Sequence, residues 1–158
     1  MTLERELGLK KAIECVPHRA LLNIYYTASC LKKRADEFFR PFGLTDVQFN
    51  VMMLLRYQSG PAGGLSQAQL SDMMLVNRAN ITSLIDRMEK VHLVLRTPAP
   101  DDRRYNIVKM TEGGRKLFDK VEPKYERQVR QIMAALKIAE QKSLTETLGK
   151  IRKKLVKQ

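Results

Sequence analysis

Hydrophobic residues follow a helical spacing over most of the chain, and the pattern is sharpest in its middle. Ser66 has a glutamine three residues later, Gln69, as in a capping box, where two side chains satisfy backbone amides at a helix start. We expect this helix to break at residues 76–77. A second helix follows, because apolar residues recur on one of its faces: Ile81, Leu84, Ile85 and Met88. Two short helices joined by a tight turn predict a helix-turn-helix.

Two short segments after these helices, residues 93–97 and 105–110, alternate apolar and polar side chains as half-buried strands do. The residues between them, 98–104, include two prolines, two aspartates and two arginines, which suit the exposed tip of a hairpin. A helix-turn-helix followed by such a hairpin predicts a winged helix-turn-helix. The expected fold class is therefore mainly α with a small β-wing, and the winged region spans residues 44–110.

Amphipathic helices are predicted on both sides of this region. A long helix should begin at Arg19 and stop near residues 41–43, and a second capping box, Thr45 with Gln48, should start the next helix. Beyond the wing we expect two further helices, the last beginning near Glu140. The stripe of the first helix contains Leu21, Ile24, Tyr25, Ala28, Leu31, Ala35 and Phe38, and that of the last contains Leu144, Leu148, Ile151 and Leu155.

These outer stripes bear on assembly. The middle of the chain, about 46 residues, can bury only a modest core. The outer helices then have apolar surface left over, and a second copy of the chain is the simplest way to bury it. An intramolecular bundle is the alternative.

Three motifs resemble the MarR (multiple antibiotic resistance regulator) family, and the likeness spans roughly residues 21–155. The motifs are residues 65–70, residues 84–90, and the wing sequence 102–104 followed by 107–114. One position departs from the family pattern, because His92 stands where the family usually has glycine after the second helix. A helix end there often needs a left-handed backbone, which histidine tolerates better than most residues but less well than glycine.

The resemblance implies a domain organisation as well as a fold. It implies one MarR-type domain over residues 1–158 that forms a symmetric homodimer. Within this domain, residues 44–110 are the expected DNA-binding region, and residues 19–42 and 111–157 are the expected dimerisation helices. Double-stranded DNA with a pseudo-palindromic site is the partner that this organisation implies.

The charge of the chain favours a polyanionic partner. Its formal net charge is +12, from 29 Lys and Arg against 17 Asp and Glu. The alternative is a basic protein that is merely soluble. Position matters more than the total: residues 77–92 hold three basic against two acidic side chains, whereas residues 103–158 hold 16 against 6. We therefore expect the wing and the C-terminal helices to attract phosphate.

The polar face of the second helix is the candidate for reading DNA bases. Asparagine pairs well with adenine and arginine with guanine in the major groove, and each good bidentate contact discriminates by about 1 to 3 kcal/mol. The alternative is a solvated polar face, and the adjoining wing favours DNA. The candidate residues of this helix are Asn77, Arg78, Asn80, Thr82, Ser83 and Arg87.

The wing is the second candidate contact. Arg103 and Arg104 are expected to enter a narrow minor groove, where the negative potential is enhanced. Free aspartates beside them would repel phosphate, and the resemblance implies that Asp102 braces one arginine by a forked ion pair. The sequence leaves open which arginine is braced. Two-fold symmetry predicts half-sites about 34 Å apart, one turn of the duplex.

The sequence leaves two mechanisms open for switching DNA binding. The resemblance implies a small aromatic or anionic effector in a cleft between the dimer helices and the winged region. The candidate lining residues are Tyr25, Tyr26, Phe49 and Met53, with ordinary core as the alternative. Oxidation of Cys15 or Cys30 is the second switch, because Cys15 lies near basic residues that can lower a thiol pKa. Residues 16–18, however, do not match the pattern of peroxide-sensing relatives.

Other classes of function have little support in the sequence. We find no glycine-rich phosphate loop, no nucleophile elbow and no cluster with the spacing of metal ligands, so we expect no enzyme activity, no cofactor and no metal. A winged helix that binds protein instead of DNA is a further alternative. Neither a membrane span nor a signal peptide is apparent, so we expect a cytoplasmic protein. Repression is the default mode, because a dimer bound over a promoter excludes polymerase.

Overall fold

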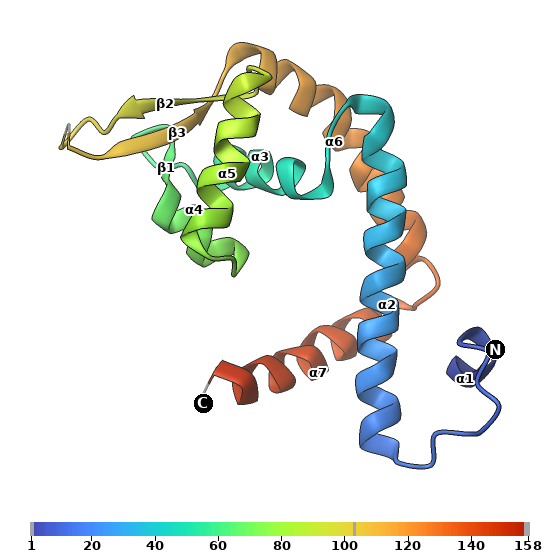
Figure 1. Ribbon diagram of the computed structural model, residues 1–158. Helices are drawn as coiled ribbons and strands as arrows, with labels where there is room; N and C mark the ends of the chain where they lie inside the picture. Colours follow the sequence, from blue (N-terminus) through green and yellow to red (C-terminus); the bar gives the residue numbers. More distant parts are fainter. Residues whose placement is uncertain (1, 103, 157–158) are drawn as a thin grey trace. The chain divides into compact units, whose positions relative to one another are not determined.

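A computed structural model describes residues 2–102 and 104–156, and the chain divides into two compact units, Met1–Thr111 and Glu112–Gln158. Figure 1 shows the elements in chain order. Unit 1 contains α1 (Leu3–Glu6), α2 (Val16–Phe39), the 3-10 turn η1 (Arg40–Phe42), α3 (Asp46–Gln58), β1 (Leu65–Ser66), α4 (Gln67–Met74), α5 (Arg78–Lys90), β2 (Val94–Pro98) and β3 (Asn106–Met110). Unit 2 contains α6 (Glu112–Met133) and α7 (Ile138–Val156). The predicted fold class, mainly helical with a small β-wing, is confirmed.

Local sequence sets the starts of α3 and α4. The Gln48 N–H donates to Thr45 Oγ1 at 3.2 Å, and the Thr45 N–H donates to Gln48 Oε1 at 2.9 Å. The same reciprocal pair joins Ser66 and Gln69, at 3.1 and 2.9 Å. Both predicted capping boxes are therefore present. Each one satisfies two backbone amides that have no partner inside the helix.

The start of α2 differs slightly from the prediction. The helix begins at Val16 instead of Arg19, because Pro17 lies in its first turn, where a missing N–H costs no hydrogen bond. It ends at Phe39, and Gly43 then takes a left-handed conformation with φ 67°. The last helix similarly begins at Ile138, two residues before the predicted Glu140.

The wing is a three-stranded antiparallel sheet in the order β1-β3-β2. The two predicted strands are present, and β3 pairs along its length with β2, from Val94 opposite Met110 to Pro98 opposite Asn106. The strand β1 was not predicted, because two residues are too few to show alternation. It approaches β3 so closely that a Cβ on Gly64 would lie 2.5 Å from the Val108 carbonyl oxygen. Only glycine fits at that position without a backbone shift.

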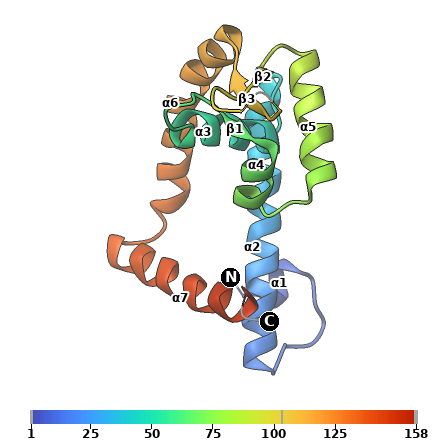
Figure 2. The same cartoon turned by 90° about the vertical axis from the view of Figure 1, so that its left-hand side faces the viewer.

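The core of unit 1 joins the helices to the sheet. Residue contacts link α2 with α3, α3 with β3, α4 with α5, and α5 with β2 (Figure 2). At one end of this core, the rings of Phe39 and Phe49 lie 4.7 Å apart between centroids. The predicted stripe of α5 is confirmed, since all four of its members are buried: Ile81, Leu84, Ile85 and Met88.

The outer helices differ from this core, since several of their predicted stripe residues are exposed. Leu21, Tyr25 and Leu31 of α2 expose 46%, 65% and 46% of their surface. In α7, which belongs to unit 2, Leu144, Ile151 and Leu155 are also exposed. Within residues 2–102 and 104–156, no helix combines the length and the apolar character needed to cross a bilayer.

Candidate DNA-binding surface

The N-terminal end of α5 is fixed by its own side chains. Asn77 precedes the helix and its side-chain oxygen accepts the Asn80 N–H at 2.9 Å, which makes it the N-cap. One turn further on, the Thr82 hydroxyl donates to the Arg78 carbonyl at 3.0 Å. Two of the six candidate base-reading residues of this helix therefore also make local hydrogen bonds that define its first turns.

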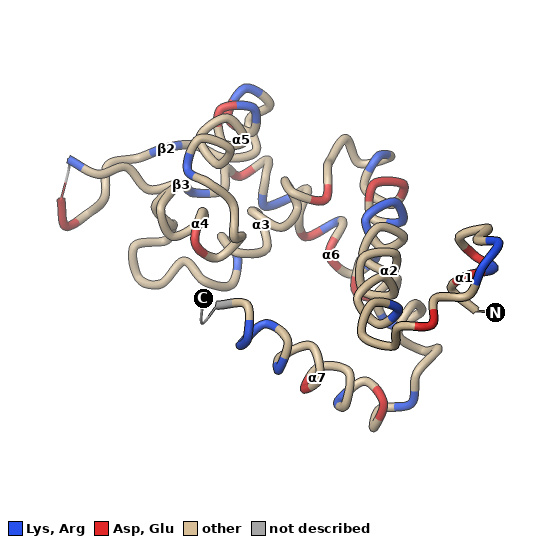
Figure 3. The backbone as a smooth tube through the Cα atoms, turned by 60° about the horizontal axis from the view of Figure 1, so that its bottom comes forward, with Lys and Arg blue, Asp and Glu red and all other residues tan. Residues whose placement is uncertain are grey.

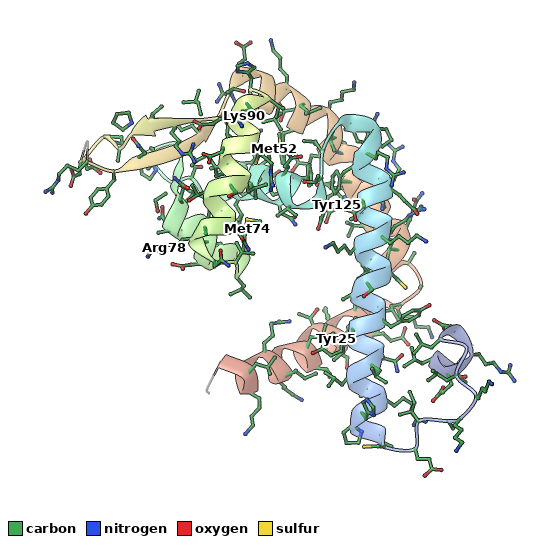
Figure 4. The ribbon with its side chains drawn as sticks, viewed as in Figure 1. Tyr25, Met52, Met74, Arg78, Lys90 and Tyr125 are labelled. Carbon is green, nitrogen blue, oxygen red and sulfur yellow. The ribbon has the colours of Figure 1, made fainter. Side chains whose placement is uncertain are left out.

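All six candidate DNA-contact residues at α5 are exposed, while the apolar stripe on the other face of the helix is buried. Figure 4 labels Arg78 and Lys90 at the two ends of α5. Between those ends, Asn80, Ser83 and Arg87 offer amide, hydroxyl and guanidinium groups on the face away from the core. This is the set of donors and acceptors that suits base edges in a major groove. The exposed groups belong to a helix whose buried stripe fixes its rotation.

A three-residue clamp, which sequence reasoning missed, joins α5 to the wing. Arg96 of β2 donates from Nη2 to Asp86 Oδ1 at 2.7 Å and from Nη1 to the Glu89 carboxylate. Its backbone N–H also donates to Glu89 Oε1, at 2.7 Å. The two acidic residues are three apart on α5, so both can face one arginine on the adjacent strand. That spacing is the only signal in the sequence that could have pointed to the clamp.

The Arg96 clamp has an electrostatic consequence as well as a mechanical one. Asp86 and Glu89 are the two acidic residues of α5, and Arg96 supplies a countercharge to both. The positive charges of Arg78, Arg87 and Lys90 are therefore less offset than the near-neutral count for this helix suggests. The clamp also holds strand β2 at the C-terminal half of α5, so it ties the wing to this helix.

The wing contains the forked ion pair that the family resemblance implied. Arg104 donates from Nε to Asp102 Oδ1 at 3.0 Å and from Nη2 to Oδ2 at 2.8 Å, and its backbone N–H also reaches Oδ1 at 3.0 Å. The Arg104 guanidinium lowers the pKa of the Asp102 carboxyl, which keeps that group ionised. Arg104 is thus the braced arginine, and its side chain is still 85% exposed. Arg103 lies outside the described residues.

The C-terminal end of α5 takes the conformation that the sequence suggested. His92 has φ 55°, which is the left-handed region, and its carbonyl accepts the Thr111 hydroxyl at 2.6 Å. The predicted left-handed helix end is confirmed. It turns the chain from α5 into β2, so that the strand starts beside the helix that it is clamped to.

The four candidate effector residues do not gather in one place within a single chain. Phe49 is fully buried against Phe39 at the end of α2, as a core residue is. Tyr25 lies fourteen residues earlier in α2, which is about 20 Å along a helix. Figure 4 shows Tyr25 and Met52, a neighbour of Met53, at different levels of unit 1. Tyr26 and Met53 are partly buried.

Both cysteines are free and exposed. Cys15 directly precedes α2 and Cys30 lies within it, about 22 Å further along the helix. A disulfide requires Cα atoms within about 7 Å, so the two cannot pair within one chain. In the part of the chain that the structure describes, no group of three or more His, Cys, Asp or Glu side chains is placed to hold a metal ion.

Positive charge is prominent outside the winged region. Figure 3 shows several Lys and Arg residues along α7. Near its C-terminal end this helix carries Lys150, Arg152, Lys153 and Lys154, all exposed. Part of the excess of basic residues that the sequence showed after residue 103 is therefore on the surface of α7.

Sequence comparison matches residues 44–105 to the model of the MarR family. The HTH-type transcriptional regulator PecS of Dickeya dadantii (strain 3937) is 26% identical over 126 residues, which are 80% of this chain and 75% of PecS. The transcriptional activatory protein BadR of Rhodopseudomonas palustris is 33% identical over 65% of this chain and 58% of BadR. The HTH-type transcriptional repressor NicR of Pseudomonas putida is 39% identical over 51% of this chain and 48% of NicR.

Solved structures agree on the fold. AbsC, a MarR family transcriptional regulator from Streptomyces coelicolor, superposes with a TM-score of 0.81 over 94% of this chain and 100% of AbsC, at 21% identity. MepR from S. aureus, solved as a complex with DNA, superposes with a TM-score of 0.76 over 85% of this chain and 96% of MepR, at 18% identity. At these identities the likeness establishes a shared architecture.

Proposed function

We propose that this chain is a helix-turn-helix transcriptional regulator of the MarR family, a homodimeric, sequence-specific DNA-binding repressor that a small effector releases from DNA. The observation that carries the proposal is the exposed polar face of α5, held beside a basic wing by the Arg96 clamp. A surface of this kind can contact the bases of one groove and the phosphates or neighbouring groove at the same time.

In this proposal α5 reads the major groove. Asn80 and Arg87 make bidentate contacts to base edges, with adenine and guanine as their preferred bases. Ser83 and Thr82 add shorter-range hydrogen bonds, and Arg78 binds the phosphate backbone at the N-terminal end of the helix. Asn77 has a smaller role in readout, because its side-chain oxygen already caps the helix.

The wing supplies the second contact. Asp102 holds Arg104 by Nε and Nη2, and this fork orders the guanidinium while most of the side chain stays exposed. An ordered arginine loses less conformational entropy when it binds than a mobile one does. We propose that Arg104 enters the minor groove or lies along its phosphates, and that Arg103 adds charge beside it.

The assembly that we propose is a two-fold dimer built from the outer helices. The exposed apolar residues of α2 and of α7 are the surfaces that a second copy would cover. A two-fold dimer of one-helix readers requires half-sites about 34 Å apart along the duplex. The DNA site is therefore expected to be a pseudo-palindrome.

For the switch we propose a small aromatic or anionic effector that binds the dimer and disfavours its DNA-bound form. Tyr26 and Met53 are the candidate lining residues that are neither fully buried nor fully exposed. Oxidation of the exposed Cys15 is the alternative switch. Loss of DNA binding on peroxide treatment, with recovery on reduction and resistance in Cys15→Ser, would favour the alternative.

The experiment that tests the proposal is a selection from mixed genomic fragments of the source organism, followed by titration of the recovered fragments at two salt concentrations. We expect enrichment of fragments that share a pseudo-palindrome. Affinity should fall steeply with salt, because phosphate contacts release counterions. A protein that enriches no fragment, and binds none at low salt, would not have the proposed function, and a winged helix that binds protein would become the better account.

A further inference from the structure

Four helical segments of unit 1, α1, η1, α4 and α5, end with the same hydrogen-bond pattern, the Schellman motif, in which one residue takes a left-handed conformation. Those residues are Gly8, Gly43, Leu75 and His92, with φ values of 64°, 67°, 53° and 55°, so two of the four are not glycine. At the Leu75 position, the N–H of Leu75 donates to the Asp72 carbonyl at 3.3 Å and the N–H of Val76 donates to the Ser71 carbonyl at 3.1 Å. Leu75 and His92 flank the reading helix α5, one before it and one after it.

Leucine is an unfavourable choice for this motif. A left-handed backbone brings Cβ close to a carbonyl oxygen, and glycine avoids that contact because it has no Cβ. Histidine tolerates the conformation better than a bulky aliphatic residue does. Leucine contributes no hydrogen bond that could offset the strain. Burial does not offset it either, because Leu75 is 89% exposed, compared with 68% for Leu155 of α7.

The turn that carries Leu75 is held in place by its neighbours. Ser71 is buried, and its hydroxyl donates to the Val76 carbonyl at 2.5 Å. Together with the two backbone hydrogen bonds, this fixes both sides of the residue. Figure 4 labels Met74 and Arg78, which bracket the turn between α4 and α5. The exposed leucine therefore projects from an ordered turn, and strain at an ordered, exposed position is a reason to look for a binding role.

We propose that Leu75 is a specificity-determining residue that makes an apolar contact with the C5-methyl group of a thymine in the major groove. The inference rests on the proposed DNA-binding function. Leu75 lies two residues before Asn77, the N-cap of α5, and the N-terminal end of a recognition helix is the part that contacts base edges. The thymine methyl is the apolar group that the major groove displays. A phosphate contact at this position would call for a charged or polar side chain.

Replacing thymine by uracil removes the C5-methyl groups of the DNA and leaves its hydrogen-bonding edges unchanged, and comparison with Leu75→Gly isolates the methyl group that Leu75 contacts. The fragment that the wild-type protein selects most strongly is amplified with either dTTP or dUTP, and affinity is measured for the wild type and for Leu75→Gly. The wild type should bind the thymine duplex about fourfold more tightly for the one methyl group that Leu75 covers. Leu75→Gly should lose this fourfold preference. The effects of Leu75→Gly and of the uracil substitution on the free energy of binding should therefore not add.

His92→Gly is the matched control, since it relieves the same backbone strain at the other end of α5 and should leave the thymine preference unchanged. The melting temperature of Leu75→Gly should equal or exceed that of the wild type. Unchanged thymine preference in Leu75→Gly, while the wild type still binds its fragment, would overturn the inference and leave the proposed function intact. A lower melting temperature or a dissociated dimer would also overturn it, because Leu75 would then serve the fold or the assembly. Failure of the wild type to bind any fragment would overturn both.

Discussion

The winged region buries many of its apolar side chains within one chain, whereas the outer helices leave several of theirs exposed. In the winged region, α3, α4 and α5 contact each other or the wing, and the α5 stripe is fully covered within one chain. In α2 and α7, several stripe residues remain exposed within the same chain. The comparison teaches that the proposed DNA-reading surface is complete in one copy, whereas the outer helices expose the apolar surface that we propose for assembly. A dimer then places two finished readers at a fixed spacing.

The largest expected effect comes from disrupting the proposed dimer interface while leaving α5 and the wing unchanged. Ile151→Glu combined with Leu155→Glu puts two carboxylates into the exposed stripe of α7. We expect a monomer by analytical ultracentrifugation and a loss of DNA affinity of about 100-fold or more, because the second half-site no longer binds at high effective concentration. Circular dichroism should show the helical content retained.

A matched variant separates charge from burial. Lys150→Gln with Lys153→Gln lowers the net charge of α7 by two, as the stripe variant does, but on its polar face, and the dimer should persist. A monomeric result for this control, or an intact dimer in the stripe variant, would show that the α7 stripe is not the assembly surface.

The next effect tests whether the wing depends on the close approach of β1 to β3. Gly64→Ala places a Cβ 2.5 Å from the Val108 carbonyl oxygen, which the backbone can accept only by shifting. We expect the free energy of unfolding to fall by about 1 to 3 kcal/mol. Chemical denaturation checks it, with Gly149→Ala as the control, since a Cβ there meets nothing nearer than 3.9 Å. Equal stability of the two variants would mean that β1 yields easily.

Removing the Arg96 clamp should have a smaller effect on stability, and it should also affect DNA binding because the clamp joins α5 to the wing. Arg96→Ala leaves Asp86 and Glu89 facing each other without their countercharge. The side chains are partly exposed, so after solvent screening we expect a loss of about 1 to 2 kcal/mol in the free energy of unfolding. DNA affinity should fall further than stability alone explains, because uncompensated carboxylates then lie near phosphate.

The exposed pair between Lys116 and Glu112 on α6 is the comparison for this clamp. Lys116→Ala should change stability hardly at all, as is usual for a surface pair. If Arg96→Ala changed neither the free energy of unfolding nor the DNA affinity, the clamp would not hold the wing to α5.

The last predicted effect is a gain in stability. His92→Gly removes the left-handed strain after α5 and should raise the free energy of unfolding by about 0.4 to 1 kcal/mol. Differential scanning calorimetry measures it. A clear drop in melting temperature would instead give the imidazole a role of its own in the turn from α5 to β2.

Sequence alone predicted the features that depend on neighbouring residues. The capping boxes of α3 and α4, the buried stripe of α5 and the left-handed end at His92 are each set within a few positions of the chain. The helix-turn-helix break was placed correctly, but not the conformation of Leu75 within it. The reason is that glycine or asparagine usually marks a left-handed position, and leucine gives no such signal.

What the sequence did not predict depends on residues far apart along the chain. Strand β1 can be recognised only through its pairing with β3, Leu65 with Val108 and Ser66 with Ile107. The Arg96 clamp spans a turn and two elements, and no local pattern requires it. The resemblance implied that Asp102 braces one arginine, and the structure shows that Asp102 is paired with Arg104. The four candidate effector residues share an apolar character but not a location.

The most direct test of the account is to repeat the genomic selection with two variants of the reader. Asn80→Ala should still bind DNA but enrich a different base at one position of each half-site, because it removes a base contact of α5. Arg103→Ala with Arg104→Ala should weaken binding to all fragments and reduce its salt dependence, with the same preferred sequence. If Asn80→Ala enriches the same sequence with the same preference as the wild type, and the wing variant binds with undiminished affinity, then α5 and the wing do not read DNA in the way proposed.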